Sequence, residues 1–408
     1  MVPDIARGMT RGRMFRALLG AAALAFHALS FAGEVAVSVA MELELQAFVS
    51  NPAGSGRHDD NFAVSLEPDF RGDFDDGNTL WRFVPFGRWD SRDPERRHGD
   101  IREMYLLHVM DDWEFLAGVS KVFWGVAESR HLVDIINQTD HLEGIDGEDK
   151  LGQPMLSVGR SFGQSTLTFY VLPGFRERAF LSADSPLSLP FAVSDDPLYE
   201  SGKGRDHMDF AVRFSGYRDV LDYGVSWFRG TSREAGFVPG MDGRLRPFYP
   251  QIEQFGLDLQ ITTESWLWKF EAIRRTFGHR AAGDDFTAAV GGFEYSFYGL
   301  RDGLFDLGLL AELHYDSRDD SGTILFQDDV FLGMRFGFTD VEGTEILAGT
   351  VIDLKDGSQS LRVEGSRRMF NNARLGLEAQ SFFNVDPGNA SYGLRNSDYA
   401  LLSLKWYF

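Results

Sequence analysis

The stretch from Phe255 to Ile261, Phe-Gly-Leu-Asp-Leu-Gln-Ile, places an apolar side chain at every second position and a glycine or polar residue between them. Side chains of a β-strand point alternately to opposite faces, so this stretch predicts a strand with one apolar and one polar face. The same alternation occurs at Met41 to Ala47 and at Ala373 to Ala379, and it dominates from residue 36 to the end. The sequence therefore indicates an all-β protein.

The connections between the predicted strands separate into two kinds. Short links such as Asp111-Asp112 and Gly163-Gln164 alternate with long ones such as 126–152 and 176–206. This pattern is typical of a transmembrane antiparallel β-barrel with short periplasmic turns and long extracellular loops, whereas a soluble sandwich has no reason to segregate its loops. We expect about eighteen strands, with sixteen as the alternative number. They are 36–49, 61–72, 78–90, 99–110, 113–125, 153–162, 165–175, 207–219, 221–232, 250–263, 266–277, 284–299, 305–317, 328–339, 344–354, 358–370, 372–384 and 397–408.

The N-terminal segment is typical of an export signal. Four arginines precede an apolar run from Ala17 to Phe31, and Ser30-Phe31-Ala32 offers small residues for cleavage. The run is shorter than the roughly 20 residues that a membrane-spanning helix needs, although such an anchor is the alternative. We therefore expect a signal peptide over residues 1–32 and a β-barrel over 33–408, located in the cell outer membrane after export through the periplasm.

Composition excludes several classes of function. The chain has no cysteine, which excludes disulfides and thiolate sites. Its formal net charge is −21, and removing a leader with four arginines and one aspartate gives −21 − 3 = −24. Such an acid excess disfavours nucleic acid, which binds cationic surfaces. We expect no nucleic-acid partner, no cofactor and no metal.

The last ten residues, Tyr399 to Phe408, alternate and end on phenylalanine, with Leu402, Leu404, Trp406 and Phe408 on the apolar side. This segment resembles the C-terminal signature by which the barrel-assembly machinery recognises bacterial outer-membrane proteins. The mature chain as a whole resembles Gram-negative porin-like barrels, among them substrate-selective porins and alginate exporters, without assignment to one family. The resemblance implies Trp406 and Phe408 as the assembly signal. It also implies outer-membrane lipid, lipopolysaccharide and small solutes as partners, and a monomer or a trimer.

If the apolar face meets lipid, the opposite face lines the pore. Cations crowd on the last three strands, where an arginine row would guide an anionic solute through forked hydrogen bonds. Salt bridges between neighbouring strands are the competing interpretation. The candidate pore-lining residues are Arg82, Arg102, Arg213, Lys269, Arg335, Arg362, Arg368, Arg374, Lys405, Glu364 and Glu378.

The long link 126–152 is the candidate constriction. Leu132, Ile135 and Ile136 are spaced for one face of a short helix, which would dock on the inner wall. Its acidic residues would then carry negative charge to the narrowest point, and no compact metal-ligand spacing stands out. The candidate constriction residues are Asp134, Asp140, Glu143 and Asp146.

No catalytic motif has the structural context that it needs. Gly159 to Gly163 matches G-x-S-x-G, but it spans a strand end and a tight hairpin instead of a strand-to-helix turn. We therefore expect a channel and no enzyme. The leading hypothesis is a passive or substrate-selective porin for small solutes, with anions favoured. The alternative is an outer-membrane scaffold or interaction barrel whose lumen is plugged.

Overall fold

The computed structural model describes residues 35–49, 58–74, 77–279, 283–318 and 326–408. The predicted signal peptide, residues 1–32, lies outside the described residues. Within the described part of the chain, no helix is long and apolar enough to cross a membrane.

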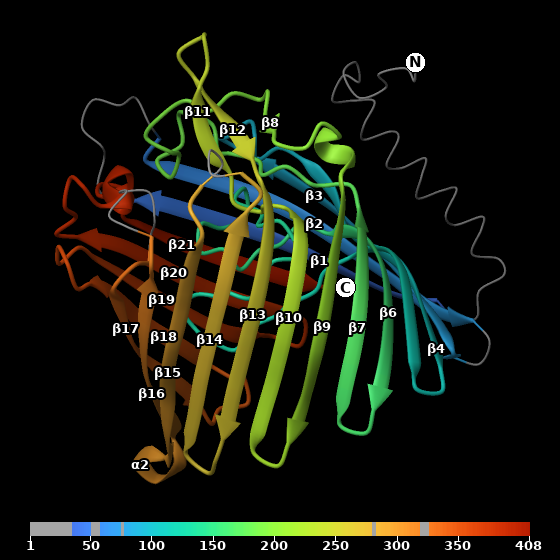
Figure 1. The fold of residues 1–408 in the computed structure, drawn as a ribbon. Coiled ribbons are helices and arrows are strands. Elements are labelled where there is room, and N and C mark those ends of the chain that lie inside the picture. Colours follow the sequence, from blue (N-terminus) through green and yellow to red (C-terminus); the bar gives the residue numbers. More distant parts are fainter. Residues whose placement is uncertain (1–34, 50–57, 75–76, 280–282, 319–325) are drawn as a thin grey trace.

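The described residues form one antiparallel sheet of eighteen strands that closes into a barrel (Figure 1). Closure occurs where β1 (Ala36–Phe48) pairs with both β2 (Asp60–Phe74) and β21 (Tyr399–Tyr407). The remaining barrel strands are β3 (Thr79–Asp90), β4 (Gly99–Met110), β5 (Trp113–Ser120), β6 (Gln153–Phe162), β7 (Ser165–Pro173), β9 (Met208–Arg218), β10 (Leu221–Thr231), β13 (Gln251–Thr262), β14 (Trp266–Phe277), β15 (Phe286–Gly299), β16 (Phe305–Asp316), β17 (Asp329–Phe338), β18 (Glu345–Asp353), β19 (Gln359–Met369) and β20 (Ala373–Phe383).

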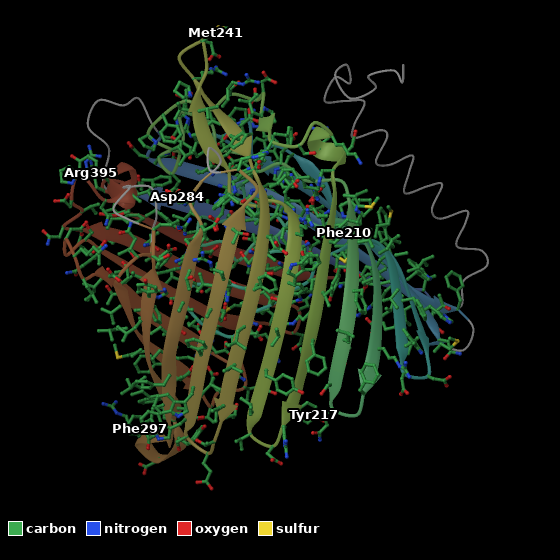
Figure 2. The ribbon with its side chains drawn as sticks, viewed as in Figure 1. Phe210, Tyr217, Met241, Asp284, Phe297 and Arg395 are labelled. Atoms are coloured by element: carbon green, nitrogen blue, oxygen red, sulfur yellow. The ribbon has the colours of Figure 1, made fainter. Side chains whose placement is uncertain are left out.

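The links define two rims. The rim with tight links, such as 111–112 and 163–164, is called the short-turn rim, and the opposite one is called the long-loop rim. In Figure 2, Tyr217 and Phe297 lie at the short-turn rim and Met241 lies at the far end of the long-loop rim. The alternation of short and long links predicted from the sequence is therefore confirmed.

The strands alternate between an apolar outer face and a polar inner face. On β16, Leu309 is 37% exposed and Leu313 is 61% exposed, whereas Leu310 and Glu312 between them are 4% and 2% exposed. An apolar exterior and a polar interior are what a closed barrel needs in a bilayer, where strands satisfy each other's backbone groups. In each strand, every second side chain therefore faces the lumen and those between them face outward.

One predicted strand is wrong at its end. We expected 113–125, but β5 stops at Ser120 and the chain turns into the lumen. The side chain of Asn137 explains the turn: its amide donates to the carbonyl oxygens of Ser120 and Leu151, both at 2.9 Å, and its oxygen accepts from the Val122 N–H at 2.9 Å. These bonds replace the strand ladder just where β5 and β6 separate.

A β-bulge in β4 interrupts the alternation of inward and outward side chains. Val84 pairs with Glu103 and Pro85 pairs with Ile101, so Arg102 has no partner in β3. Proline cannot donate to the ladder, and a bulge accommodates it. As a result both Arg102 and Glu103 bond to groups inside the barrel.

In the described part of the chain, three short strands and several short helical turns lie outside the barrel wall. β8 (Leu198–Tyr199), β11 (Gly236–Pro239) and β12 (Leu245–Tyr249) form a separate sheet at the long-loop rim, which the sequence analysis did not predict. The helical turns include η3 (Gly204–Asp206), α2 (Leu300–Gly303) and η5 (Ala390–Leu394).

Candidate functional site

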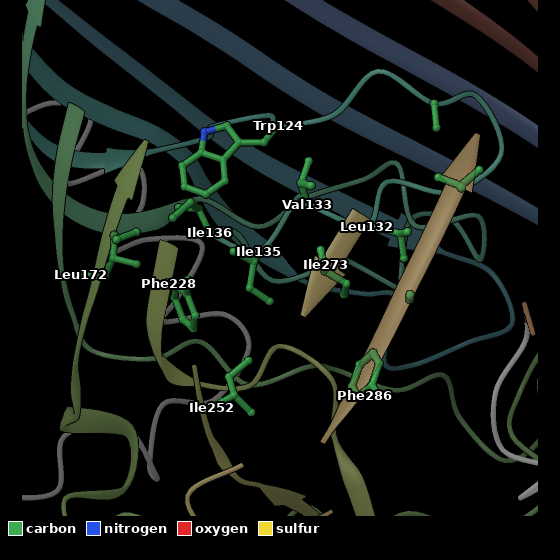
Figure 3. Close-up of a cluster of buried hydrophobic side chains, with 14 of the residues drawn as sticks. Trp124, Leu132, Val133, Ile135, Ile136, Leu172, Phe228, Ile252, Ile273 and Phe286 are labelled. Atoms are coloured by element: carbon green, nitrogen blue, oxygen red, sulfur yellow. The ribbon is translucent and has the colours of Figure 1, made fainter. Parts of the chain in front are cut away.

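The link 121–152 folds into the barrel and docks on the inner wall through apolar side chains (Figure 3). Val133 and Ile136 are fully buried, and Leu132 and Ile135 are nearly so. They pack with residues of β6, β7, β9, β10, β13, β14 and β15, among them Phe228. The predicted helix is wrong, because no residue of this link belongs to a helix. Its backbone bonds to side chains of the wall instead.

Two wall carboxylates hold this backbone. Glu271 on β14 accepts the N–H groups of Val126, Ala127 and Val133 at 2.7, 2.9 and 3.1 Å. Gly125 permits this approach, since its φ is +135° and an added Cβ would lie 2.8 Å from the Glu271 carboxylate.

A second carboxylate continues the anchoring on β16. Glu312 accepts the N–H groups of Glu128 and Ser129 at 2.7 and 2.9 Å. Charge-assisted bonds of this kind are stronger than bonds between neutral groups. The link is therefore fixed along two neighbouring parts of the wall.

The acidic half of the link reaches other parts of the wall through ion pairs. Asp140 bonds Arg102 at 2.5 Å, Glu143 bonds Arg88 at 2.7 Å, and Asp146 bonds Arg362 on β19 at 2.6 Å. The link therefore crosses from the β14–β16 wall to β19. The fourth predicted constriction residue, Asp134, is buried and pairs with Lys150 at 3.1 Å.

Crowding of these acids changes the charge state of a neighbour. Asp149 lies on the cavity side of the same link, near Asp146, Glu143 and Asp140. Enclosure in the barrel and then the charges of these carboxylates raise the pKa of Asp149 to about 7.

Most of the predicted pore-lining cations are already paired. Arg82 bonds Asp69 at 3.0 Å and Glu103 at 2.5 Å, and Arg213 forms a forked pair with Asp258, both bonds at 2.8 Å. At these positions, the ion pairs favour the interpretation that the cations form salt bridges between strands over the interpretation that they bind a solute.

Two further predicted cations share a carboxylate of the link. Lys269 and Arg335 contact Glu128 at 3.1 and 2.8 Å, and Arg335 also lies 3.4 Å from Glu294. Through Glu128 they join the link to β14 and β17. Their charge is therefore part of the loop anchorage.

The cations of the last strands lie in register. In the strand register, Arg368 of β19 lies opposite Arg374 of β20, and Arg374 lies opposite Lys405 of β21, near the short-turn rim. Lys405 lies 3.5 Å from Glu42 of β1, and Arg374 lies 3.9 Å from Glu345. Arg368 has no ion pair with the residues that the structure describes.

Arg362 lies deeper in the lumen than this row. It contacts Glu378 at 3.2 Å and Glu364, in addition to Asp146. Three carboxylates therefore surround one guanidinium, which leaves this part of the wall without excess positive charge.

An arginine cluster that the sequence analysis did not assemble lies around Glu234, in the link between β10 and β11. Arg275 and Arg318 contact Glu234 at 3.1 and 3.6 Å, and Arg318 and Arg130 contact Asp316 at 2.5 and 3.5 Å. Enclosure in the barrel would raise the pKa of Glu234, but the surrounding arginines outweigh this effect and lower that pKa to about 2.

Arg178 completes the cluster and differs from the other three. Its side chain bonds the carbonyl oxygen of Arg233 at 2.9 Å and the amide oxygen of Gln138 at 3.4 Å. It has no ion pair with any residue in the described part of the chain. Four guanidinium groups thus share two carboxylates, and the cluster carries excess positive charge.

A cavity of about 2890 Å³ runs beside both charged regions. It is lined by the arginine cluster and by Asp146 and Asp149 of the link. Along the wall it extends from Asn389 at the long-loop rim to Glu345 and Ser366, which lie next to the short-turn rim. The link and the cluster therefore narrow the lumen without filling it.

Two groups resemble chemical sites and lack an essential feature. Ser129 Oγ lies 2.8 Å from His314 Nε2, but His314 Nδ1 has no hydrogen-bond partner among the described residues, so no acid orients the ring for base catalysis. The carboxylates of Asp140 and Glu143 near His98 are held by arginines, which disfavours a cation there.

Comparison with known proteins shows likeness in fold only. The sequence matches no protein-family model and no curated protein. Among solved structures, OccK5 (OpdH) of Pseudomonas aeruginosa has a TM-score of 0.56 at 10% identity, over 93% of this chain and 99% of that chain. OccAB3 of Acinetobacter baumannii has a TM-score of 0.56 at 9% identity, over 92% of this chain and 99% of that one.

The closed sheet, the apolar outer face and the polar lumen define the class of protein. The chain is a porin-like transmembrane β-barrel of the outer-membrane type. Eighteen antiparallel strands, a docked lumenal link and a continuous cavity are its particular features.

Proposed function

We propose that this protein is an outer-membrane channel that passes small solutes passively and favours anions. The observation that carries the proposal is the cavity of about 2890 Å³, which runs along β17–β21 between the two rims. A plugged scaffold would need this space to be filled by side chains or loops.

The preference for anions rests on the arginine cluster around Glu234. Among the described residues, most other lumenal cations are paired with carboxylates. Within that same part of the chain, Arg130, Arg275 and Arg318 of the cluster have ion pairs with Glu234 and Asp316 alone, and Arg178 has none. Rows of fixed charge at a constriction select which ions pass, and guanidinium groups bind carboxylate or phosphate through forked hydrogen bonds. The acidic link faces the same cavity, so an anion would pass on the arginine side.

The partners that we propose follow from this placement. Membrane lipid and lipopolysaccharide would contact the apolar outer face, the barrel-assembly machinery would insert the chain, and small solutes would cross the lumen. A signal peptide over residues 1–32 would direct export.

Single-channel recording of the refolded protein in a planar bilayer tests the proposal. We expect discrete conductance steps and a reversal potential, under a salt gradient, that shows anion preference. Arg178→Gln removes a charge without leaving a carboxylate unpaired. It should lower the anion-to-cation permeability ratio roughly fivefold, because a unit charge at about 4 Å contributes about 1 kcal/mol in water-like surroundings.

Arg229→Gln is the matched control, because Arg229 is exposed on the outer face of β10, the same face as the exposed Val225. It removes the same charge and should leave the ratio unchanged. Cation preference in the unmodified channel would overturn the role of the arginine cluster. Silence from a correctly folded barrel would overturn the channel itself and favour the scaffold.

A further inference from the structure

Arg160 is an arginine on the outer face of the barrel. On β6 it follows the exposed Leu156 and precedes the exposed Phe162, whereas Met155 and Ser157 of the same strand are buried. Its guanidinium lies 4.9 Å from the ring centroid of Trp113 and 5.0 Å from that of Phe162. Among the described residues this guanidinium has no ion pair and no hydrogen bond.

The depth of Arg160 is set by two tight links. Trp113 is the first residue of β5 after the link 111–112, and Phe162 is the last residue of β6 before the link 163–164. Outward aromatic residues such as Trp266 and Tyr295 lie near the same rim, and their rings are 4.6 Å apart. Aromatic girdles mark the level of the lipid headgroups.

We propose that Arg160, flanked by Trp113 and Phe162, binds the phosphate of a phospholipid headgroup in the leaflet at the short-turn rim. An unpaired guanidinium facing hydrocarbon is costly, but this cost falls to about 0–1 kcal/mol near the interface. The two rings hold the guanidinium by cation–π contacts. A phosphodiester supplies the paired oxygen acceptors that this fork matches.

The site binds a lipid and not a free anion, since its two rings present apolar surface to acyl chains beside the charged group. Phe162 is 50% exposed and Phe115, stacked on Trp113 at 6.1 Å, is 37% exposed. The arginine and the rings therefore match the two chemically different parts of one phospholipid.

Native mass spectrometry of the full chain in detergent tests this inference, with dioleoyl phosphatidylglycerol as the probe. We expect a bound lipid, and Arg160→Ala should weaken its binding about tenfold, the effect of losing one charge-assisted hydrogen-bonded contact. Arg160→Lys, which keeps the charge and loses the fork, should give an intermediate value. The electrophoretic mobility of the unheated barrel reports whether each variant is folded.

Arg367→Ala is the matched control. Arg367 is also exposed near the short-turn rim, but it contacts Asp340 at 3.7 Å and Glu342 at 3.3 Å, so its replacement should not change lipid binding. Dioleoylglycerol, which has the same chains and no phosphate, should bind much more weakly than the phospholipid, and inorganic phosphate should not compete. Equal binding of both lipids, competition by phosphate, or unchanged binding to Arg160→Ala would each overturn the proposal.

Discussion

Asp149 is a residue whose charge changes near neutral pH and whose side chain faces the cavity. Its pKa is raised to about 7, so the carboxyl is mostly ionised at pH 8 and mostly neutral at pH 6. Lowering the pH through this range therefore removes negative charge from the lumen. We predict that anion preference increases from pH 8 to pH 6. Asp149→Asn should reduce this change without abolishing it, because His131 also lines the cavity. Burial lowers the pKa of His131, but its hydrogen bond to Glu148 outweighs burial and raises that pKa, so the imidazole gains positive charge as the pH falls.

Asp242→Asn serves as the control for this titration, because Asp242 is exposed next to Met241 at the far end of the long-loop rim. This variant should keep the pH dependence of the unmodified channel. An Asp149→Asn channel whose reversal potential shifts between pH 8 and pH 6 as much as that of the unmodified channel would show that Asp149 does not contribute to the titration.

The link 121–152 is an element whose position depends on a few wall side chains. The Glu271 carboxylate accepts three backbone N–H groups of the link. In Glu271→Gln one of the two acceptor oxygens becomes an NH₂ group, which cannot accept a hydrogen bond and faces an N–H donor of the link. We predict that docking is weakened by about 1.5–3 kcal/mol, the cost of a hydrogen bond to a charged group. The measurement is the rate of trypsin cleavage after Arg130, which should increase while the barrel stays folded.

Glu253→Gln is the control on the neighbouring strand. Glu253 accepts from Trp227 Nε1 at 2.7 Å and makes no bond to the link. Its replacement should leave the cleavage rate unchanged. Equal cleavage of the Glu271→Gln and unmodified proteins would show that the apolar contacts alone hold the link.

The closure of the whole barrel involves backbone groups at the C-terminus. The Phe408 N–H donates to Val39 O at 3.0 Å, and the Val39 N–H donates to Phe408 O at 3.2 Å. Phe408→Ala keeps both bonds, so we predict nearly unchanged stability of the refolded barrel. If Phe408 and Trp406 act as an assembly signal, the same variant should accumulate less in the outer membrane of cells.

Phe297→Ala is the control for this comparison, because Phe297 is also an exposed aromatic residue at the short-turn rim. It should affect assembly less than Phe408→Ala. If Phe408→Ala clearly lowers the stability of the refolded barrel as well as its amount in the outer membrane, Phe408 acts through the fold and not through recognition.

The sequence alone determined the barrel wall. Alternation with a period of two fixes which side chain faces lipid, and links such as 163–164 fix where strands reverse, because both are local properties of the chain. Strand β6 (Gln153–Phe162) therefore has the predicted bounds. The predicted bounds failed where side chains from elsewhere in the chain replace strand pairing. At the end of β5, Asn137 forms the hydrogen bonds that a continued strand would have made with its neighbour.

The tertiary structure alone decided the charge of the lumen. Arg130, Arg178, Arg275 and Arg318 come from three links and one strand, and nothing in their spacing predicts that they meet around Glu234. Likewise, the predicted guide Arg362 is surrounded by carboxylates, one of them from a link far away in the sequence. Alternation places a side chain on the inner face, but its partners depend on how the long links fold across the barrel, and these contacts leave no local pattern.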